Sequence, residues 1–395
     1  MTALLDNVVI VGMARTPMGA MQGALSACTA ADLGAAAITG ALRNGDLEPD
    51  QIEAVIMGCV LPAGVGQAPA RQAALKAGLP ASVCATTVNK VCGSGMKAVM
   101  QGVDAIRAGS AKLLIAGGME SMSNAPHMLA KARSGYRLGH GELLDHMFTD
   151  GLQDAYSGQL MGVFAEATAE KYGFSREAQD AFALESLRRA RQAVDDNHFK
   201  SEITPITLEG RKGVVTVERD ESIEIAKPEK IPTLKPAFKT GGTVTAANAS
   251  SIADGAAALL LMPKSEALAR GLAPLAEIKA CAEHAQAPEW FTTAPVGAIE
   301  QVLSKSGWDI ADVDLFEINE AFAVVTMAAI HDLALDANKV NIHGGACALG
   351  HPLGASGARL IVTLIAALQS QQKKRGIASL CIGGGEATAI ALELL

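Results

Sequence analysis

Residues 88–95 read VNKVCGSG, and they open a segment that runs through a helical pattern to LLIAGGME at 113–120. A second segment has the same plan, because VNIHGGACALGHPLGASG at 340–357 leads through another helical pattern to LCIGGGEA at 380–387. Each segment predicts a strand, a glycine-rich turn, a buried helix and a second strand. One copy in each half of the chain predicts two similar α/β domains related by pseudo-symmetry. The alternative is a chance likeness between two ordinary βαβ units.

Short apolar runs bounded by glycine predict buried strands elsewhere in the chain. These runs are 8–11, 54–57, 113–116, 257–262, 313–318 and 379–382. Apolar residues at helical spacing predict helices over 96–107, 175–195 and 358–368. Because strands and helices alternate, we expect an α/β fold built on parallel sheets.

The middle of the chain differs from both halves. From about residue 121 to 250 it is richer in charge, His and Met, and its polar stretch 201–239 contains several prolines. Such a segment is typical of an insertion whose loops cover a site. We therefore expect a first half made of 1–120 and 251–272, an inserted loop domain at 121–250, and a second half at 273–395.

Composition limits the kinds of partner. A formal net charge of −8 argues against a nucleic-acid surface, although a local basic patch can still bind an anionic ligand. The seven scattered cysteines predict free thiols in a reducing compartment. Residues 1–12 have no basic segment and reach Asp6 at once, so we expect no secretory signal. No apolar run approaches the ~20 residues of a membrane span. These features predict a cytoplasmic protein with no membrane or nucleic-acid partner.

Cys92 is the first candidate for chemistry. It lies between a predicted strand and a predicted helix, with glycines after it that permit a sharp turn and a close approach of a ligand. The N–H groups and positive dipole end of that helix would favour a thiolate, the nucleophilic form. The alternative is a small buried Cys that fills a tight turn.

His351 and Cys381 occupy corresponding places in the second half. If the halves pack about a pseudo-twofold axis, both side chains face Cys92 across one cleft. A neutral imidazole can take the Cys92 proton, and a second thiol poised a little above neutral pH can act as an acid or base. His343, Cys347 and His351 also show a four-residue spacing that resembles metal ligands, but the glycines among them and Pro352 disfavour the required helix.

Asn319 and Glu320 follow the strand predicted at 313–318. Polar residues at the carboxyl end of such a strand are where α/β sites gather, and an amide there can hold a water or donate to an oxyanion. The competing interpretation is a helix N-cap, since Asn is among the best capping residues.

Four motifs together resemble the thiolase family: VCGSG around Cys92, NEAF from Asn319, GHP around His351 and CIGGG from Cys381. The resemblance covers the whole chain and extends to ARTP (14–17), GGMESMS (117–123), TVTAANAS (243–250) and DGA (254–256). It implies two pseudo-symmetric αβαβα halves with an inserted loop domain. It also implies a homotetramer assembled through 124–148, which contains His127, Arg133, Arg137 and His140.

The resemblance assigns roles residue by residue. Cys92 would carry the acyl group, His351 would activate it, and Cys381 would be the acid or base at the α-carbon. Asn319 would hold a water that forms one oxyanion hole with His351, and the N–H groups of Cys92 and Gly383 would form the other. The remaining contacts are to the pantetheine arm, by Ser250, Ala246, Phe238 and Phe322, and near the acyl group, by Leu160 and Met161. No metal and no bound cofactor are implied, because CoA and acyl-CoA are substrates.

These assignments predict an acyltransferase that condenses two acetyl-CoA molecules to acetoacetyl-CoA and CoA, or runs the reverse thiolysis. The alternative is a 3-ketoacyl-CoA thiolase of broader chain length, favoured by Leu160 where short-chain relatives often have His. Glu386 is a second departure, since Gln or Met is frequent there. Cys381 argues against a β-ketoacyl synthase, which uses one Cys and two His. The intact motifs argue against a non-catalytic lipid-binding relative, and the second thiol argues against a papain-like hydrolase.

Overall fold

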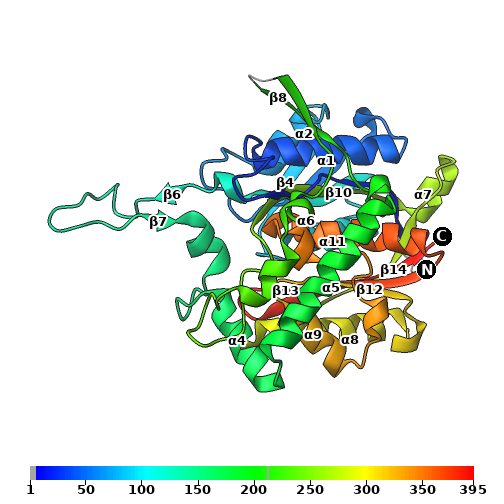
Figure 1. Cartoon of the computed structure of the whole chain (residues 1–395). Helices are drawn as coiled ribbons and strands as arrows, with labels where there is room; N and C mark the ends of the chain where they lie inside the picture. The colour runs from blue at the N-terminus through cyan, green and yellow to red at the C-terminus, as the bar shows by residue number, and fades with distance from the viewer. Residues whose placement is uncertain (1–5, 211–212) are drawn as a thin grey trace.

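A mixed sheet of ten strands runs through the molecule in a computed structural model, which describes residues 6–210 and 213–395. Residues 1–5, part of the segment expected to lack a secretory signal, lie outside the described residues. The strand order is β12-β13-β14-β11-β1-β10-β5-β3-β4, with the short β2 paired to β10. Figure 1 shows the sheet crossing between layers of helices.

The elements of the chain fall into three groups. The first half contains β1 (Val8–Arg15), β2 (Gly19–Ala20), α1 (Ala30–Asn44), β3 (Ala54–Gly58), α2 (Pro69–Lys76), β4 (Cys84–Val88), α3 (Ser94–Arg107), β5 (Leu114–Ser121), β10 (Ala253–Pro263) and α7 (Lys264–Ala269). The insertion contains β6 (His127–Met128), β7 (Leu144–Asp145), α4 (Met161–Tyr172), α5 (Arg176–Asp195), β8 (Ile206–Gly210), β9 (Gly213–Val217) and α6 (Glu221–Ile225). The second half contains β11 (Ala276–Ala285), α8 (Ala294–Ser306), β12 (Leu315–Ile318), α9 (Ala323–Asp332), α10 (Ala346–Leu349), α11 (Leu353–Ser370), β13 (Arg375–Ile382) and β14 (Glu386–Leu394).

The predicted repeat is confirmed by the strand order. Read from the outer edge of the sheet towards its middle, the first half has the order β4-β3-β5-β10-β1 and the second half has the order β12-β13-β14-β11. The second half lacks a counterpart of β4, because the strand expected at 340 is reduced to one parallel bridge between Val340 and Phe316. Asn341 has a φ of 48° and ends the extended backbone at that point.

The expectation of parallel sheets is wrong for the middle of the molecule. The outer pairs β3–β4, β3–β5 and β12–β13 are parallel, but β10 pairs antiparallel with both β1 and β5, and β14 pairs antiparallel with both β11 and β13. A three-residue connection joins β13 to β14, and so short a loop permits only an antiparallel pair. The two halves meet where β1 and β11 pair over two residues.

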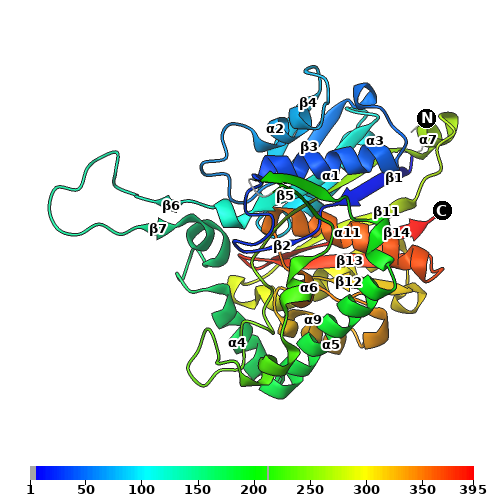
Figure 2. The ribbon, with the colours of Figure 1, turned by 45° about the horizontal axis from the view of Figure 1, so that its top comes forward.

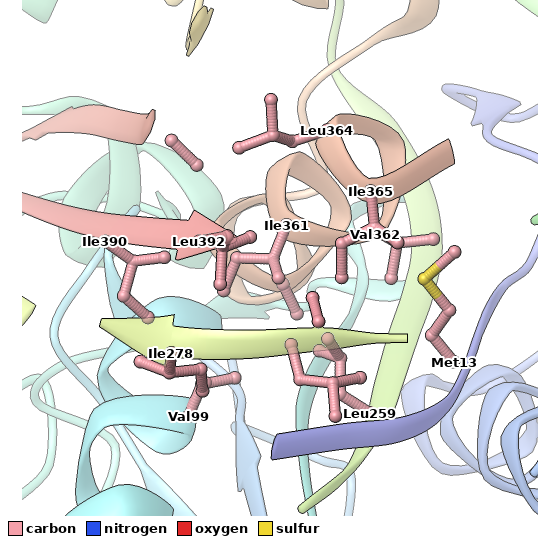
Figure 3. Close-up of a cluster of buried hydrophobic side chains, with 14 of the residues drawn as sticks. Met13, Val99, Leu259, Ile278, Ile361, Val362, Leu364, Ile365, Ile390 and Leu392 are labelled. Carbon is pink, nitrogen blue, oxygen red and sulfur yellow. The ribbon is translucent and has the colours of Figure 1, made fainter. Parts of the chain in front are cut away.

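The five-layered arrangement follows from where the helices pack. Helices α1 and α2 cover one face of the first half and α8 and α9 cover the second half, with α11 between them (Figures 1 and 2). Helix α3 packs against α11. The main core joins α11 and α3 to strands of both halves, and Figure 3 shows Ile361 of α11 and Val99 of α3 close to β11, with Ile278 beside Val99. Helix α11 is apolar and long enough to span a membrane by composition, but 89% of it is buried as the central helix of this core.

Glycines let α3 and α11 cross with their backbones in contact. A methyl group on Gly95 would lie 2.8 Å from Ala358 N and 2.9 Å from Gly354 O, and one on Gly357 would overlap Met96 N. Because the neighbours are backbone atoms, they cannot move aside as a flexible side chain can. The crossing therefore brings the N-terminal ends of the two central helices together.

A buried ion-pair cluster attaches the insertion to the first half. Arg15, at the end of β1, is fully buried, and its Nε lies 2.7 Å from Glu202 while Nη1 lies 2.7 Å from Asp220. Both carboxylates belong to the insertion, so one guanidinium fixes two of its segments. A buried charge left unpaired is costly, which makes this contact specific.

We expect Gly357→Ala to lower the melting temperature, because the added methyl overlaps the backbone of α3. Overpacking of this kind costs about 1–3 kcal/mol, which exceeds the helix-propensity gain of Ala. Gly34→Ala on α1 is the matched control, since its methyl would meet the Met119 Sδ atom at the end of a flexible side chain. Equal melting temperatures for the two variants would contradict the backbone contact.

Candidate active site

A cavity of about 600 Å³ opens at the point where α3 and α11 begin. Cys92, His351, Cys381 and Gly383 line it together, although they come from both halves of the chain. The predicted contacts Leu160, Met161, Phe238, Ala246, Ser250 and Phe322 line it as well. The cavity lining therefore includes every predicted site residue except Asn319, which lies beside the His351 ring.

The Cys92 turn has a strained backbone. Val91 has a φ of 45°, a left-handed conformation that a β-branched residue rarely adopts. Side chains on both sides hold it, since Asn89 Oδ1 accepts from Val91 N at 2.9 Å and Ser94 Oγ donates to Val91 O at 2.6 Å. The turn aims Cys92 into the cavity just before α3 begins at Ser94.

Burial determines the charge state of Cys92, and this overturns the expected thiolate. Desolvation raises the pKa of the Cys92 thiol to about 11, and the N–H groups of Gly383 and Cys92 only partly offset it. The same N–H groups are the pair predicted to bind an oxyanion. The resting side chain is therefore a protonated thiol that needs a base.

His351 meets that need. Its Nδ1 lies 2.5 Å from Ser356 Oγ, and that hydroxyl donates its own proton to Pro352 O at 2.9 Å. Nδ1 must therefore be the donor to Ser356, which leaves Nε2 without a proton and able to accept one. Burial and then the Arg359 guanidinium lower the pKa of His351 to about 3, so the imidazole stays neutral at physiological pH.

Cys381 lies at the end of β13 and is 1% exposed. Burial, followed by the nearby Cys92, raises its pKa well above the usual value for a thiol. The expectation that it is poised a little above neutral pH is wrong, because it assumed a solvated site. Its resting form is also a protonated thiol.

Asn319 is buried, and its Nδ2 lies 3.4 Å from His351 Nε2. Its Oδ1 has no hydrogen-bond partner among the described residues. It does not cap a helix, because α9 begins at Ala323 with Phe322 at the N-cap. The amide is thus free to hold a polar group beside the imidazole.

Glu320 has a structural role that the sequence did not reveal. Its carboxylate accepts hydrogen bonds from Ser186 Oγ at 2.7 Å, Asn341 Nδ2 at 2.9 Å and Cys347 N at 3.1 Å. These bonds join α5 of the insertion to the turn that precedes His351. Ser356 was also missed, although a Ser five residues after a candidate histidine, on the first turn of a helix, is a readable signal.

The metal-like series does not assemble. His343 stacks on His198 with ring centroids 4.6 Å apart, whereas Cys347 Sγ contacts Glu320 O and His351 faces the cavity. Among the residues that the structure describes, no group of three or more His, Cys, Asp or Glu side chains is placed to hold a metal ion.

Comparison with known proteins gives consistent results over the full length. Residues 8–265 match the family model "Thiolase, N-terminal domain" and residues 272–394 match "Thiolase, C-terminal domain". An acetyl-CoA acetyltransferase of Escherichia coli is 49% identical over 99% of this chain and 100% of its own length. Acetyl-CoA acetyltransferase 2 of Arabidopsis thaliana is 50% identical over 98% and 97%.

Two solved structures have the same fold. The acetyl-CoA acetyltransferase of Bacillus anthracis superposes with a TM-score of 0.97 at 40% identity, covering 99% of both chains. The Acat5 thiolase of Ascaris suum, in complex with coenzyme A, superposes with a TM-score of 0.94 at 43% identity, covering 99% of this chain and 100% of that one.

We expect alkylation of Cys92 by iodoacetamide to accelerate about tenfold per pH unit between pH 7 and 10. The thiolate is the reactive form, and its fraction grows tenfold per unit below a pKa of about 11. Peptide mass spectrometry follows the site, with exposed Cys84 in the same digest reporting the reagent. A rate that levels off below pH 8 would show a thiolate at rest.

Proposed function

The chain belongs to the thiolase family, and from this premise we propose that Cys92 transfers acyl groups between CoA thioesters in the reaction 2 acetyl-CoA = acetoacetyl-CoA + CoA. The protein is an acyltransferase of thiolase function. The convergence of two thiols and a neutral imidazole on one cavity is the observation that supports these residue roles.

In the first half-reaction, His351 Nε2 takes the proton of Cys92 as Sγ attacks the acetyl-CoA carbonyl. The oxygen becomes negative between the N–H groups of Cys92 and Gly383, and one such donor contributes roughly 3 kcal/mol in comparable sites. The Cys381 thiol gives its proton to the departing CoA sulfur. Acetyl-Cys92, a protonated His351 and a Cys381 thiolate remain.

In the second half-reaction, the Cys381 thiolate removes an α-proton from another acetyl-CoA. The enolate oxygen accepts from the protonated Nε2 of His351 and from a water held by Asn319. The enolate carbon attacks the acetyl carbonyl, which forms the carbon–carbon bond and releases the Cys92 sulfur. Cys92 then takes its proton back from His351, so all three groups return to their resting states.

The CoA arm enters past a wall of aromatic rings. Phe238 and Phe322 meet edge to face with centroids 5.9 Å apart, and Ala246 and Ser250 lie beside them on the cavity wall. We assign the pantetheine arm to this channel, which agrees with CoA being present in the Ascaris suum structure. CoA and its esters are substrates here, and the proposal includes no further cofactor.

The acyl end of the cavity is apolar. We assign this end to five apolar residues of the cavity lining: Met122, Phe148, Leu152, Leu160 and Met161. A Leu at 160 supplies no hydrogen bond to a short acyl group and suits a longer chain. This wall supports the second candidate function, a 3-ketoacyl-CoA thiolase of broader chain length.

The insertion carries the proposed assembly surface. Strands β6 and β7 and the loop between them project from the body as a long arm (Figures 1 and 2), and Leu138 in that loop is 99% exposed. We propose a cytoplasmic homotetramer joined through residues 124–148. We also propose division of the chain at 1–120 with 251–272, 121–250 and 273–395.

Acetyl-CoA should add one acetyl group to Cys92, as measured by mass spectrometry of the quenched protein, and Cys92→Ser should abolish turnover. Cys381→Ala should keep that acetylation, because CoA with a thiol pKa near ~8.5 leaves readily without an acid. The same variant should lose deuterium exchange into acetyl-CoA by roughly 10²–10⁴-fold. Full turnover of Cys92→Ser, or unchanged exchange in Cys381→Ala, would refute the assigned roles.

Thiolysis of C4 and C8 3-ketoacyl-CoA should proceed with kcat/KM values within about tenfold of each other, because the wall at residue 160 is apolar. Leu160→His should lower the C8 value more than the C4 value. Leu268→His is the matched control, since Leu268 is 61% exposed on α7 and lies outside the cavity lining. Strict C4 use by the unaltered protein would count against the broader candidate.

A further inference from the structure

Four charged side chains form a bridge between the two halves next to the cavity. Lys90 Nζ forms an ion pair with Glu386 and lies 3.3 Å from Glu283 Oε1. Lys97 Nζ lies 2.6 Å from Glu283 Oε2. Both lysines belong to the first half and both glutamates to the second, so each ion pair crosses the junction.

The bridge connects the two turns that supply the Cys92 and Gly383 N–H groups. Lys90 lies two residues before Cys92, and Glu386 lies three residues after Gly383. Glu386 is the first residue of β14, opposite Ile382 at the end of β13, so it closes the hairpin that contains Gly383. Glu283 lies on the neighbouring strand β11, where it pairs in register with Thr388, two residues after Glu386.

The Gly383 hairpin has no side chains of its own to hold it. Its loop is Gly383, Gly384 and Gly385, and the last two have φ values of 93° and 91°. Glycine loses more conformational entropy than any other residue when it becomes ordered. Gly385 O accepts from Gln286 N at 2.8 Å, which ties the end of the loop to the second half. Glu386 is the flanking residue that reaches across to the Cys92 turn, so it links the direction of the Gly383 N–H to that turn.

We propose that Lys90 and Glu386 are positioning residues that hold the Gly383 N–H in line with the Cys92 N–H, so that both reach the thioester oxygen. The inference rests on the proposed function. The bridge contains two ammonium groups and two carboxylates, so its charges largely cancel at the Cys92 sulfur. Its effect on the reaction is therefore to fix the positions of the two turns.

The ion pair persists over the working pH range. Burial alone would lower the pKa of Lys90, but the bond to Glu386 and the charge of Glu283 outweigh burial and raise it. Lys90 is 21% exposed and Glu386 39%, so salt screens part of their attraction. The effect on catalysis is accordingly moderate and arises from alignment of the oxyanion donors.

The test is a double-mutant cycle with Lys90→Gln, Glu386→Gln and the double variant. We expect each single variant to slow acetylation of Cys92 by acetyl-CoA about tenfold in quenched single turnovers, with the KM for acetyl-CoA changed less than about twofold. The double variant should be no slower than Lys90→Gln, because Lys90→Gln already removes the contact that Glu386→Gln removes. Glu393→Gln is the matched control on β14, where Glu393 pairs with Arg375 at 3.1 Å far from the cavity, and it should acetylate at the unaltered rate.

Unaltered acetylation rates in both single variants would overturn the inference, as would additive losses in the double variant or an equal loss in Glu393→Gln. A loss that appears wholly in KM would assign the pair to substrate binding and would also overturn it. If the unaltered protein itself accepts no acetyl group on Cys92, the proposed function fails instead, so the two failures are distinguishable.

Discussion

The backbone contact between α3 and α11 is the constraint on which the rest of the structure depends. Gly95 and Gly357 allow the two central helices to touch without intervening side chains. Because each helix starts at the cavity, the contact brings the Cys92 turn and the His351 turn to one place. Any residue with a side chain at the crossing would separate the helices, and with them the groups that react.

Bringing the two turns together removes water from the reactive groups, and this desolvation sets their protonation states. Burial raises the pKa of both thiols and lowers that of His351, so the resting site contains no charge on its three reactive groups. Charge appears only when a thioester is attacked, at positions where N–H groups and an imidazole already point. Preorganised donors in a water-excluded site stabilise such charge more than water does.

Much of the fold was predictable from local pattern. The six apolar runs and three helical patterns all became strands and helices, because their periodicity reflects burial within one half of the chain. Cys92, His351 and Cys381 were identifiable from glycine-rich turns at the starts of helices and the ends of strands. The antiparallel pairing of β10 and β14 and the loss of a strand at Val340 depend on how distant segments return to the sheet, which periodicity does not encode.

The errors about charge have a different origin. The sequence shows a helix start after Cys92 and so favours a thiolate, but the pKa depends on how completely the two halves exclude water. Glu386 likewise acquires its role only when the halves meet, since it contacts Lys90 across 296 residues of chain. Contacts between residues so far apart in the sequence cannot be predicted from motifs or from residue spacing.

The most direct measurement of the central claim is a crystal structure of the protein acetylated at Cys92 with CoA bound. We expect the acetyl oxygen to lie within hydrogen-bond distance of the N–H groups of Cys92 and Gly383, with Cys381 Sγ and His351 Nε2 facing the acetyl carbon. An acetyl oxygen directed away from both N–H groups, or a CoA sulfur outside the cavity at the starts of α3 and α11, would contradict it.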